Sequence, residues 1–276
     1  MTVSDAIRAA AERLTSTSDT ARLHAELLMT HALGVGRSEL LIGMGGNAWS
    51  VPPEFDGFVK RRAAHEPIAY ILGHQEFYGR EFRVTPDVLI PRGDSETVIE
   101  AALEAAPDAK HVLDLGTGSG ALLISLLLEL RGACGVATDI SGPALAIARA
   151  NARHHKLLET QARFIQSDWR QPDWSQELGV FDLIVCNPPY VESDADLGLN
   201  VRGFEPHGAL FAGADGLDDY RILIPQFSGL LADGGVVILE IGAAQGDSVS
   251  ALAQASGFAT ELRHDLANRH RAVILR

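Results

Sequence analysis

Apolar residues in the first 75 positions repeat every three to four residues, which is the period of an amphipathic helix. Ala6, Ile7, Ala10 and Leu14 show this spacing most clearly. No cluster of titratable residues typical of a catalytic site occurs here. We therefore expect a helical domain whose role is either substrate docking or packing. Helices are predicted over residues 6–14, over residues 23–31 after the cap candidates Ser18 and Asp19, and over residues 50–62, with Gly34 and Gly36 interrupting the pattern.

After this stretch the pattern changes. Between Gln75 and Pro91 the period falls toward two, which predicts a β-hairpin that turns at Gly79 and Arg80. Beyond it, short apolar runs alternate with helical stretches, and this alternation is typical of a mainly parallel, doubly wound α/β sheet. The predicted strands are Val112–Leu115, Cys134–Thr138, Arg163–Gln166, Phe181–Cys186, Val236–Ile241, Ala259–Leu262 and His270–Leu275, and the predicted helices are Glu96–Ala106, Gly120–Leu130, Pro143–His154, Leu217–Leu231 and Ala244–Ser256.

The change of period predicts three parts. Residues 1–74 form the helical domain, residues 75–91 a hairpin linker, and residues 92–276 the α/β domain that carries the chemistry. At 276 residues the chain is long enough for two hydrophobic cores.

Composition and cysteine content indicate a soluble protein of the cytoplasm. Apolar residues make up 46% of the chain, and no apolar run is long enough to cross a bilayer. The N-terminal residues lack the basic start and apolar centre of a signal peptide. Cys134 and Cys186 both fall in predicted buried strands, which favours reduced thiols over a disulfide framework. The ten histidines are scattered, so no metal site is expected.

The net charge of −13 is concentrated in the α/β part. The first 75 residues carry 7 basic and 8 acidic side chains, and the rest of the chain carries 16 basic and 28 acidic ones. Proteins that bind nucleic acid usually cluster Lys and Arg to neutralise phosphates. The charge therefore argues against a nucleic acid substrate.

A glycine-rich loop follows the first predicted α/β strand. Gly116, Thr117, Gly118, Ser119 and Gly120 lie between this strand and a helix, at the first crossover of a nucleotide-binding type of fold. Glycines at such a loop let the backbone approach a ligand closely. Because the loop also fits a relaxed dinucleotide pattern, it leaves NAD and S-adenosylmethionine (SAM) both open.

Acidic residues end the next two strands. Asp139 is placed to accept hydrogen bonds from two ribose hydroxyls, although it could instead cap the helix that begins near Ser141. Asp168 could accept from an adenine amino group, and Trp169 could lie against the adenine ring or pack under the loop. Asp114 is at least as well suited to pin the glycine loop through backbone N–H groups as to contact the ligand. These residues suit NAD and SAM equally.

The motif Asn187-Pro188-Pro189-Tyr190 (NPPY) follows directly on the fourth strand and favours SAM. The Asn187 side-chain oxygen and the Pro188 carbonyl can each accept one N–H of a planar NH2 group, and the prolines fix their positions. Tyr190 can then pack against that group. A dehydrogenase has no evident use for this clamp, so the motif predicts methyl transfer to an amide or an exocyclic amine.

With these residues assembled, the chain resembles the bacterial release-factor glutamine methyltransferases, the PrmC/HemK family. The resemblance covers nearly the whole length. It is carried by EPIAYILG at residues 66–73, EFYG at 76–79, LIPRGDSE at 89–96, NPPY at 187–190 and shorter segments up to the tail DLAN at 265–268. Three residues depart from the family pattern: Gly93 replaces a proline, Ser95 a threonine and Asn268 a glycine.

The resemblance implies a helical N-terminal domain joined by a hairpin to a SAM-dependent methyltransferase domain. It implies N5-methylation of the glutamine in the Gly-Gly-Gln (GGQ) motif of peptide-chain release factors, acting in translation termination. The matched positions assign cofactor binding to Gly116–Gly120, Asp139, Trp169 and Asn187, and Asp168 joins this predicted set from its place after the third strand. They assign the glutamine to Asn187, Pro188, Pro189 and Tyr190, with Asn187, Pro188 and Tyr190 as the catalytic set. We expect a monomer.

Other interpretations stay open at this point. A methyltransferase for adenine in DNA or RNA would use the same clamp, and a related enzyme could methylate glutamine in a ribosomal protein. A SAM-binding scaffold without activity is a further alternative. Glu205 and His207, in the loop after Tyr190, could act as acid or base, but we favour loop packing or substrate contact.

Overall fold

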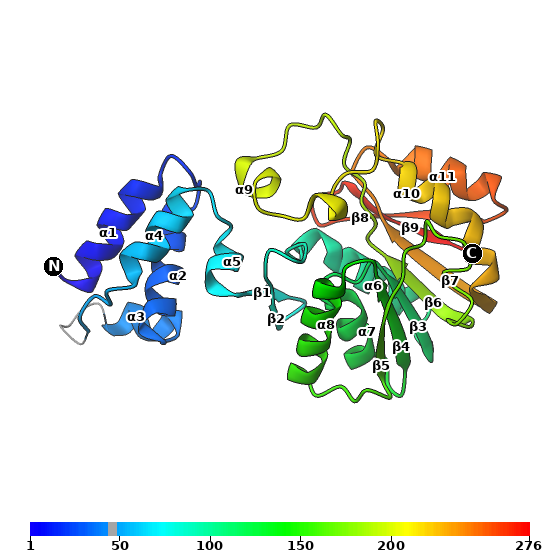
Figure 1. Ribbon diagram of the computed structural model, residues 1–276, viewed down its shortest axis with the longest axis horizontal. Coiled ribbons are helices and arrows are strands. Elements are labelled where there is room, and N and C mark those ends of the chain that lie inside the picture. The colour runs from blue at the N-terminus through cyan, green and yellow to red at the C-terminus, as the bar shows by residue number, and fades with distance from the viewer. Residues whose placement is uncertain (44–48) are drawn as a thin grey trace. The chain divides into compact units, whose positions relative to one another are not determined.

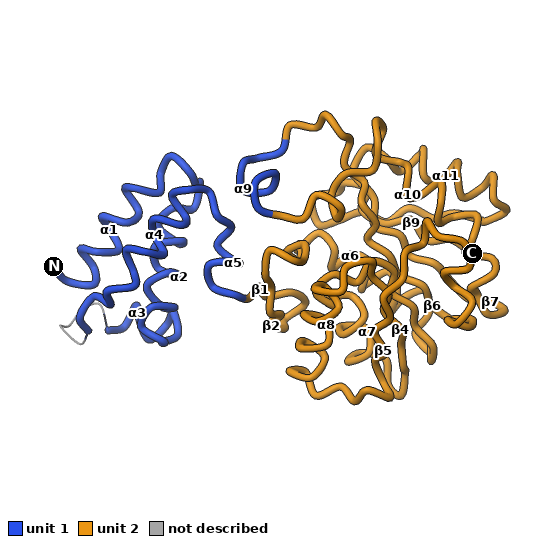
Figure 2. Tube along the Cα trace, viewed as in Figure 1, with its two compact units in different colours: residues 1–73, 197–204 blue, residues 74–196, 205–276 orange. Residues whose placement is uncertain are grey.

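The computed structural model describes residues 1–43 and 49–276. The chain divides into two compact units, which Figure 2 shows in different colours. Residues 1–73 and 197–204 form the smaller unit, and residues 74–196 and 205–276 form the larger one. The segment 197–204 lies far along the sequence from the N-terminal helices, so its membership of the smaller unit is not apparent from the sequence.

The smaller unit is helical. Its α1 begins with a capping box in which Thr2 and Asp5 satisfy each other's backbone N–H groups. The helix predicted over residues 23–31 forms as α2, and its buried face carries Ala25, Leu28 and Met29, whereas Leu23 at the start of the predicted range is exposed. Three short helices were not predicted. The helices are α1 (Val3–Leu14), α2 (Ala21–Leu33), α3 (Arg37–Gly43), α4 (Phe55–Ala63), α5 (Ile68–Leu72) and α9 (Leu199–Arg202).

The larger unit begins with the predicted hairpin and continues as a seven-stranded sheet (Figure 1). In the strand order β5-β4-β3-β6-β7-β9-β8, all strands run parallel except β9, which is antiparallel to both of its neighbours, β7 and β8. The predicted doubly wound fold is confirmed. The strands are β1 (His74–Phe77) and β2 (Arg80–Arg83) in the hairpin, then β3 (His111–Leu115), β4 (Cys134–Asp139), β5 (Ala162–Gln166), β6 (Phe181–Cys186), β7 (Leu231–Glu240), β8 (Thr260–His264) and β9 (His270–Leu275).

Helices cover both faces of this sheet because its strands are apolar on both sides. Val112 of β3 packs with α6 (Glu96–Ala105), α7 (Ala121–Glu129) and α8 (Gly142–His154). Leu113 on the opposite face packs with α10 (Asp218–Leu223) and α11 (Gly246–Ala255). The strand order reverses between β3 and β6, and ligands of such sheets bind at the carboxyl ends of the strands beside this reversal.

Two local predictions were wrong. The single helix expected over residues 217–231 is α10 followed by the 3-10 helix η3 (Ile224–Gly229), because Pro225 has no N–H to continue an α-helix. Residue 231 already belongs to β7. Cys134 is only partly buried at the start of β4, whereas Cys186 is fully buried.

Asn268 adopts a left-handed backbone with φ +58°, and its N–H donates to the Asp265 carbonyl. Asparagine is, after glycine, among the residues that tolerate this conformation best. Asn268 is therefore compatible with the left-handed turn that this chain forms at position 268.

Gly93 is the first residue of the 3-10 helix η1 (Gly93–Ser95), and Arg92 before it is extended, with φ −106° and ψ 142°. Both conformations suit a proline at position 93, and the Gly93 N–H makes no hydrogen bond among the described residues. We expect Gly93→Pro to raise the free energy of unfolding by about 0.4–1 kcal/mol, because it restricts the unfolded chain. Urea unfolding measures this, and a lowered stability would contradict the assigned backbone.

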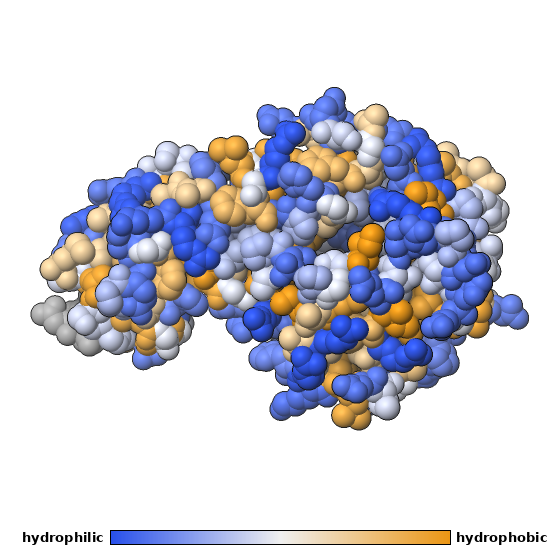
Figure 3. All heavy atoms as spheres, viewed as in Figure 1, coloured by the Kyte–Doolittle hydropathy of each residue, from blue (hydrophilic) through white to orange (hydrophobic). Residues whose placement is uncertain are grey.

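No helix in the described parts of the chain is both long and apolar enough to span a lipid bilayer. On the face shown in Figure 3, hydrophilic side chains cover much of the surface, with apolar ones scattered between them.

Candidate active site

The glycine loop lies between β3 and α7 and is shaped by positive φ angles of +73° at Gly116 and +55° at Gly118. The N–H groups of Gly116 and Thr117 both donate to the Thr138 carbonyl of β4, at 2.9 Å each. A Cβ atom at Gly116 would lie 3.1 Å from the ring of Trp169. Position 116 therefore requires glycine both for its backbone and for the close approach of the indole.

Asp139, at the end of β4, holds the loop from the other side. Its Oδ2 accepts from the Gly118 N–H and its Oδ1 from the Ser141 N–H, both at 2.8 Å. Ser141, not Asp139, caps α8, with Ser141 Oγ accepting from the Ala144 N–H. Burial raises the pKa of the Asp139 carboxyl, and the three backbone N–H groups near it oppose that rise. Each carboxylate oxygen retains a second lone pair for a ligand hydroxyl.

Trp169 packs on the loop and also lines the cavity described below. Its indole Nε1 donates to Asp219 Oδ1 at 2.8 Å, which fixes the ring across Gly116. Asp219 is itself buried and paired with Arg170. The neighbouring Asp168 accepts from the Arg170 N–H and remains at the cavity wall. Loop packing and ligand contact, posed as alternatives for Trp169, are thus compatible.

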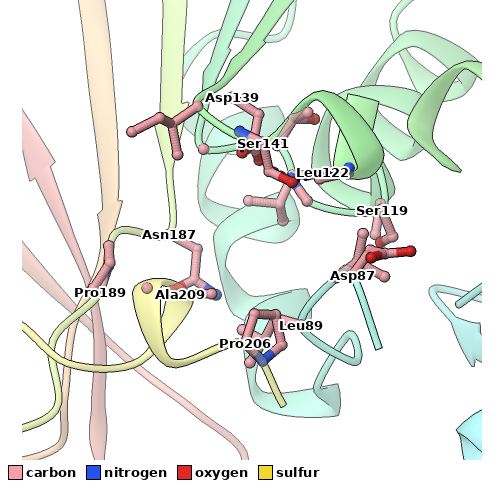
Figure 4. Close-up of a pocket in the computed structure, with 18 of the residues that line it drawn as sticks. Asp87, Leu89, Ser119, Leu122, Asp139, Ser141, Asn187, Pro189, Pro206 and Ala209 are labelled. Carbon is pink, nitrogen blue, oxygen red and sulfur yellow. Dashed lines mark hydrogen bonds between the residues drawn. The ribbon is translucent and has the colours of Figure 1, made fainter. Parts of the chain in front are cut away.

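Asn187 follows β6, and its side chain points into the cavity toward the segment that carries Ala209 (Figure 4). Its carboxamide has no hydrogen-bond partner among the described residues, so both the oxygen and the NH2 group are available to a ligand. Pro189 also lines this cavity, while Pro188 is buried and does not.

The Tyr190 side chain lies outside the cavity, whereas we predicted that it packs against the NH2 group of the substrate. Its ring packs against the apolar core on the β7 side of the sheet. The Tyr190 hydroxyl donates to Glu240 Oε1 at 3.2 Å. Its backbone carbonyl accepts from Gln245 Nε2 at 3.0 Å. Tyr190 is therefore anchored behind the motif.

Gly216 presses against this anchor, with φ +68° and an ideal Cβ position only 2.3 Å from the Tyr190 carbonyl oxygen. We expect Gly216→Ala to lower the free energy of unfolding by about 2 kcal/mol or more and to displace the NPPY motif. Gly257→Ala is the matched control, because Gly257 has φ +92° but no atom within 4 Å of its Cβ position. Equal losses in urea unfolding for the two variants would show that the contact with Tyr190 adds nothing.

The cavity has a volume of about 200 Å³ and lies at the carboxyl ends of β3, β4, β5 and β6. It brings together most of the predicted cofactor residues but not Gly120. Sequence reasoning missed its remaining wall, which two distant segments supply. The lining includes Gly116, Thr117, Gly118, Ser119, Asp139, Asp168, Trp169, Asn187 and Pro189 among the predicted residues, and Asp87, Leu89, Pro91, Pro206 and Ala209 among the others.

Glu205 joins these two wall segments. It is buried, its Oε2 accepts from the Ile90 N–H, and its Oε1 pairs with the Arg92 guanidinium. This position agrees with the loop-packing role favoured for Glu205. Arg92 of the PRGDSE segment holds Glu205 in place through this ion pair. Both carboxylate oxygens are occupied, which leaves Glu205 poorly placed to act as a base.

Asp114, in β3, supports the loop from below. Its Oδ2 accepts from the Thr117 hydroxyl at 2.6 Å, rather than from the backbone N–H groups that we expected. The side chain is buried, and burial raises the pKa of Asp114 to about 7 from 3.8.

This buried acid has a consequence for stability. Between pH 4 and pH 7 the folded protein keeps a proton on Asp114 that the unfolded chain has lost, so the site loses stability as pH rises. Asn cannot titrate. We compare the free energies of unfolding of Asp114→Asn and the parent. The difference, variant minus parent, should increase by at most about 1.4 kcal/mol per pH unit across this window and then level off. Urea unfolding at pH 5 and pH 8 measures it, and a constant difference would show that Asp114 is ionised throughout.

Among residues 1–43 and 49–276, no group of three or more His, Cys, Asp or Glu side chains is placed to hold a metal ion.

Two family models match the chain: the PrmC N-terminal domain over residues 5–73 and the methyltransferase small domain over residues 94–202. A release factor glutamine methyltransferase from Cereibacter sphaeroides is 42% identical over 285 residues, covering 100% of this chain and 99% of the relative. One from Moorella thermoacetica is 43% identical, covering 93% and 91%. Among solved structures, a methyltransferase from Pyrococcus furiosus shares the fold, with a TM-score of 0.53, 17% identity and coverage of 72% of this chain and 89% of that one.

Proposed function

The chain belongs to the release factor glutamine methyltransferase family, and we propose that it transfers a methyl group from SAM to the side-chain nitrogen, N5, of the glutamine in the GGQ motif of release factors. The observation that carries the proposal is the position of Asn187. Its unpartnered carboxamide points into the same cavity as the glycine loop, so an amide held there lies next to the cofactor.

SAM is the cofactor that the methyltransferase domain implies, and the cavity has donors and acceptors that suit it. Asp139 offers carboxylate lone pairs for a ribose diol, and Asp168 an acceptor for an adenine amino group. Trp169 offers an apolar ring face, and Gly118 has no atom within 4 Å of its Cβ position, so its backbone is open to a ligand. When bound, SAM supplies a methyl group that its sulfonium has already activated.

The protein's own contribution is positioning. An amide nitrogen is a poor nucleophile because its lone pair is delocalised into the carbonyl. In the proposed arrangement Asn187 Oδ1, which lines the cavity, accepts one N–H of the glutamine. The Pro188 carbonyl is the second proposed acceptor, although Pro188 lies outside the cavity lining, so the glutamine has to reach past the cavity edge to meet it. The two contacts leave electron density on the nitrogen and direct it toward the donor. Fixed orientation of this kind can contribute about 7–11 kcal/mol to lowering a barrier. The proton leaves the nitrogen afterwards.

The proposal includes the setting of the reaction. Release factors work in translation termination, so we propose that the enzyme acts in the cytoplasm, as a monomer, on the GGQ-containing domain of the factor. The excess of 28 acidic over 16 basic residues after position 75 supports a protein substrate over a nucleic acid.

The test is mass analysis of a purified release factor after incubation with this protein and SAM. One methyl group on the GGQ glutamine is expected, and none when that glutamine is replaced by alanine. A ribosomal protein and an adenine-containing RNA serve as competing substrates. Methylation of either of these, with none on the release factor, would refute the proposed substrate.

A further inference from the structure

Glu240 ends β7 directly beside the NPPY motif. Strands β6 and β7 pair in parallel with Cys186 opposite Leu239, so Asn187 and Glu240 follow next to each other at the carboxyl ends of the two strands. Glu240 is only 1% exposed. Glu240 follows the last β6–β7 pair by one residue and pairs with Ala272 of β9. A carboxylate buried this deeply loses its contact with water, so its presence here calls for a structural or functional explanation.

Glu240 contacts the NPPY motif through Tyr190, and on its other side it interacts with Ser95 of the cavity wall. The Tyr190 hydroxyl donates to Glu240 Oε1 at 3.2 Å, and the Tyr220 hydroxyl donates to the Glu240 backbone carbonyl at 2.7 Å. Oε2 is buried without a hydrogen-bond partner among the described residues. Tyr220 is fully buried, so it gives the end of β7 a rigid support.

The charged neighbour of Glu240 is already neutralised by other acids. Arg271 in β9 pairs with Asp94 at 2.9 Å and lies 3.7 Å from Asp265, and its Nη1 donates to the Ile241 carbonyl. Burial raises the pKa of Glu240 to about 7, while Ser95, Arg271 and Tyr190 oppose the rise and Asp94 adds to it. Arg271 is thus shared with Asp94 and Asp265, so an ion pair with Arg271 does not by itself account for Glu240.

We propose that Glu240 is a positioning residue: by holding the Tyr190 hydroxyl it fixes the end of the NPPY motif, and through it the direction of the Asn187 carboxamide. The inference rests on the proposed function, whose clamp it deepens. The backbone of the motif is held at the same point, since Gln245 Nε2 donates to the Tyr190 carbonyl. Glu240 and Gln245 thus secure the side chain and the backbone of one residue from behind the site.

The experiment is a double-mutant cycle with Tyr190→Phe, Glu240→Gln and the double variant. Glu261→Gln in the edge strand β8 is the matched control, because the Glu261 side chain is 43% exposed. Each single variant should lower kcat for release-factor methylation by about 10-fold, with KM for SAM and for the factor within about 2-fold of the parent. The double variant should be no slower than either single one, because both remove the same hydrogen bond. Glu261→Gln should match the parent.

A second measurement does not depend on activity. Hydrogen exchange of the peptide that contains Asn187–Val191 should quicken in both single variants, while exchange in β3 stays unchanged. Tyr190→Phe removes one hydroxyl only, so it remains informative even if Glu240→Gln does not fold.

Parent-like kcat and exchange in Tyr190→Phe would overturn the inference, as would losses that multiply in the double variant. If the parent transfers no methyl group to a release factor, the proposed function fails, and the exchange experiment alone then decides the role of Glu240.

Discussion

Asn187→Ala should lower kcat for release-factor methylation by about 1,000-fold while the protein still folds. The side chain contacts no other described residue through hydrogen bonds and points into the cavity, so its removal leaves no protein group unsatisfied. It does remove one of the two acceptors that hold the glutamine amide. Loss of a single well-placed hydrogen-bonding group in an active site typically costs 100- to 1,000-fold in kcat, and here alignment is lost as well. Single-turnover methylation of a purified release factor measures the effect.

Asn187→Gln tests whether the position of the carboxamide matters as well as its presence, because it keeps the carboxamide but moves it by one methylene. We expect it to be nearly as slow as the alanine variant. Binding of S-adenosylhomocysteine and the thermal midpoint should both stay close to those of the parent. Near-normal turnover of Asn187→Ala, with folding intact, would remove Asn187 from the mechanism.

The sequence predicted those parts of the fold that are determined by residues close to one another along the chain. Strand β6 was predicted over its observed bounds, Phe181–Cys186, because a short apolar run followed by Pro188 and Pro189 has few alternatives. The glycine loop was placed correctly because a strand, glycines and a helix in that order define one turn. Where a local rule was overlooked, as at Pro225 within the predicted helix 217–231, the prediction was wrong.

Other features could not be predicted because they join distant residues. Glu205 pairs with Arg92 across 113 positions, Trp169 with Asp219 across 50, and Tyr190 with Glu240 across 50. Each partner is an ordinary polar residue in its own segment, and only the strand order brings them together. The same reason explains Tyr190: its ring suits a flat ligand in isolation, but Glu240 and the core behind it offer a competing partner that the motif does not show.

Asp139→Asn should weaken binding of S-adenosylhomocysteine by about 100-fold. Both carboxylate oxygens accept backbone N–H groups, from Gly118 and Ser141 at 2.8 Å. An asparagine replaces one acceptor with an NH2 donor, which then faces one of these N–H groups, and the glycine loop loses its tie to β4. The same substitution removes an acceptor and the negative charge from the ribose position, and hydrogen bonds to a charged group are worth about 1.5–3 kcal/mol. Isothermal titration calorimetry measures the binding directly.

Asp108→Asn, the same change at an exposed position outside the cavity, should bind S-adenosylhomocysteine as the parent does. The pH response gives a further check, because burial raises the pKa of Asp139 above its ordinary value of 3.8. In the parent, affinity should therefore fall as pH is lowered into the range where this carboxyl gains a proton, since the protonated acid accepts hydrogen bonds less well. Asp139→Asn has no such proton to gain, so its weak affinity should lack this dependence. If the two proteins lose affinity in parallel on acidification, or if Asp139→Asn binds as tightly as the parent, the carboxylate cannot be the acceptor that holds the ribose.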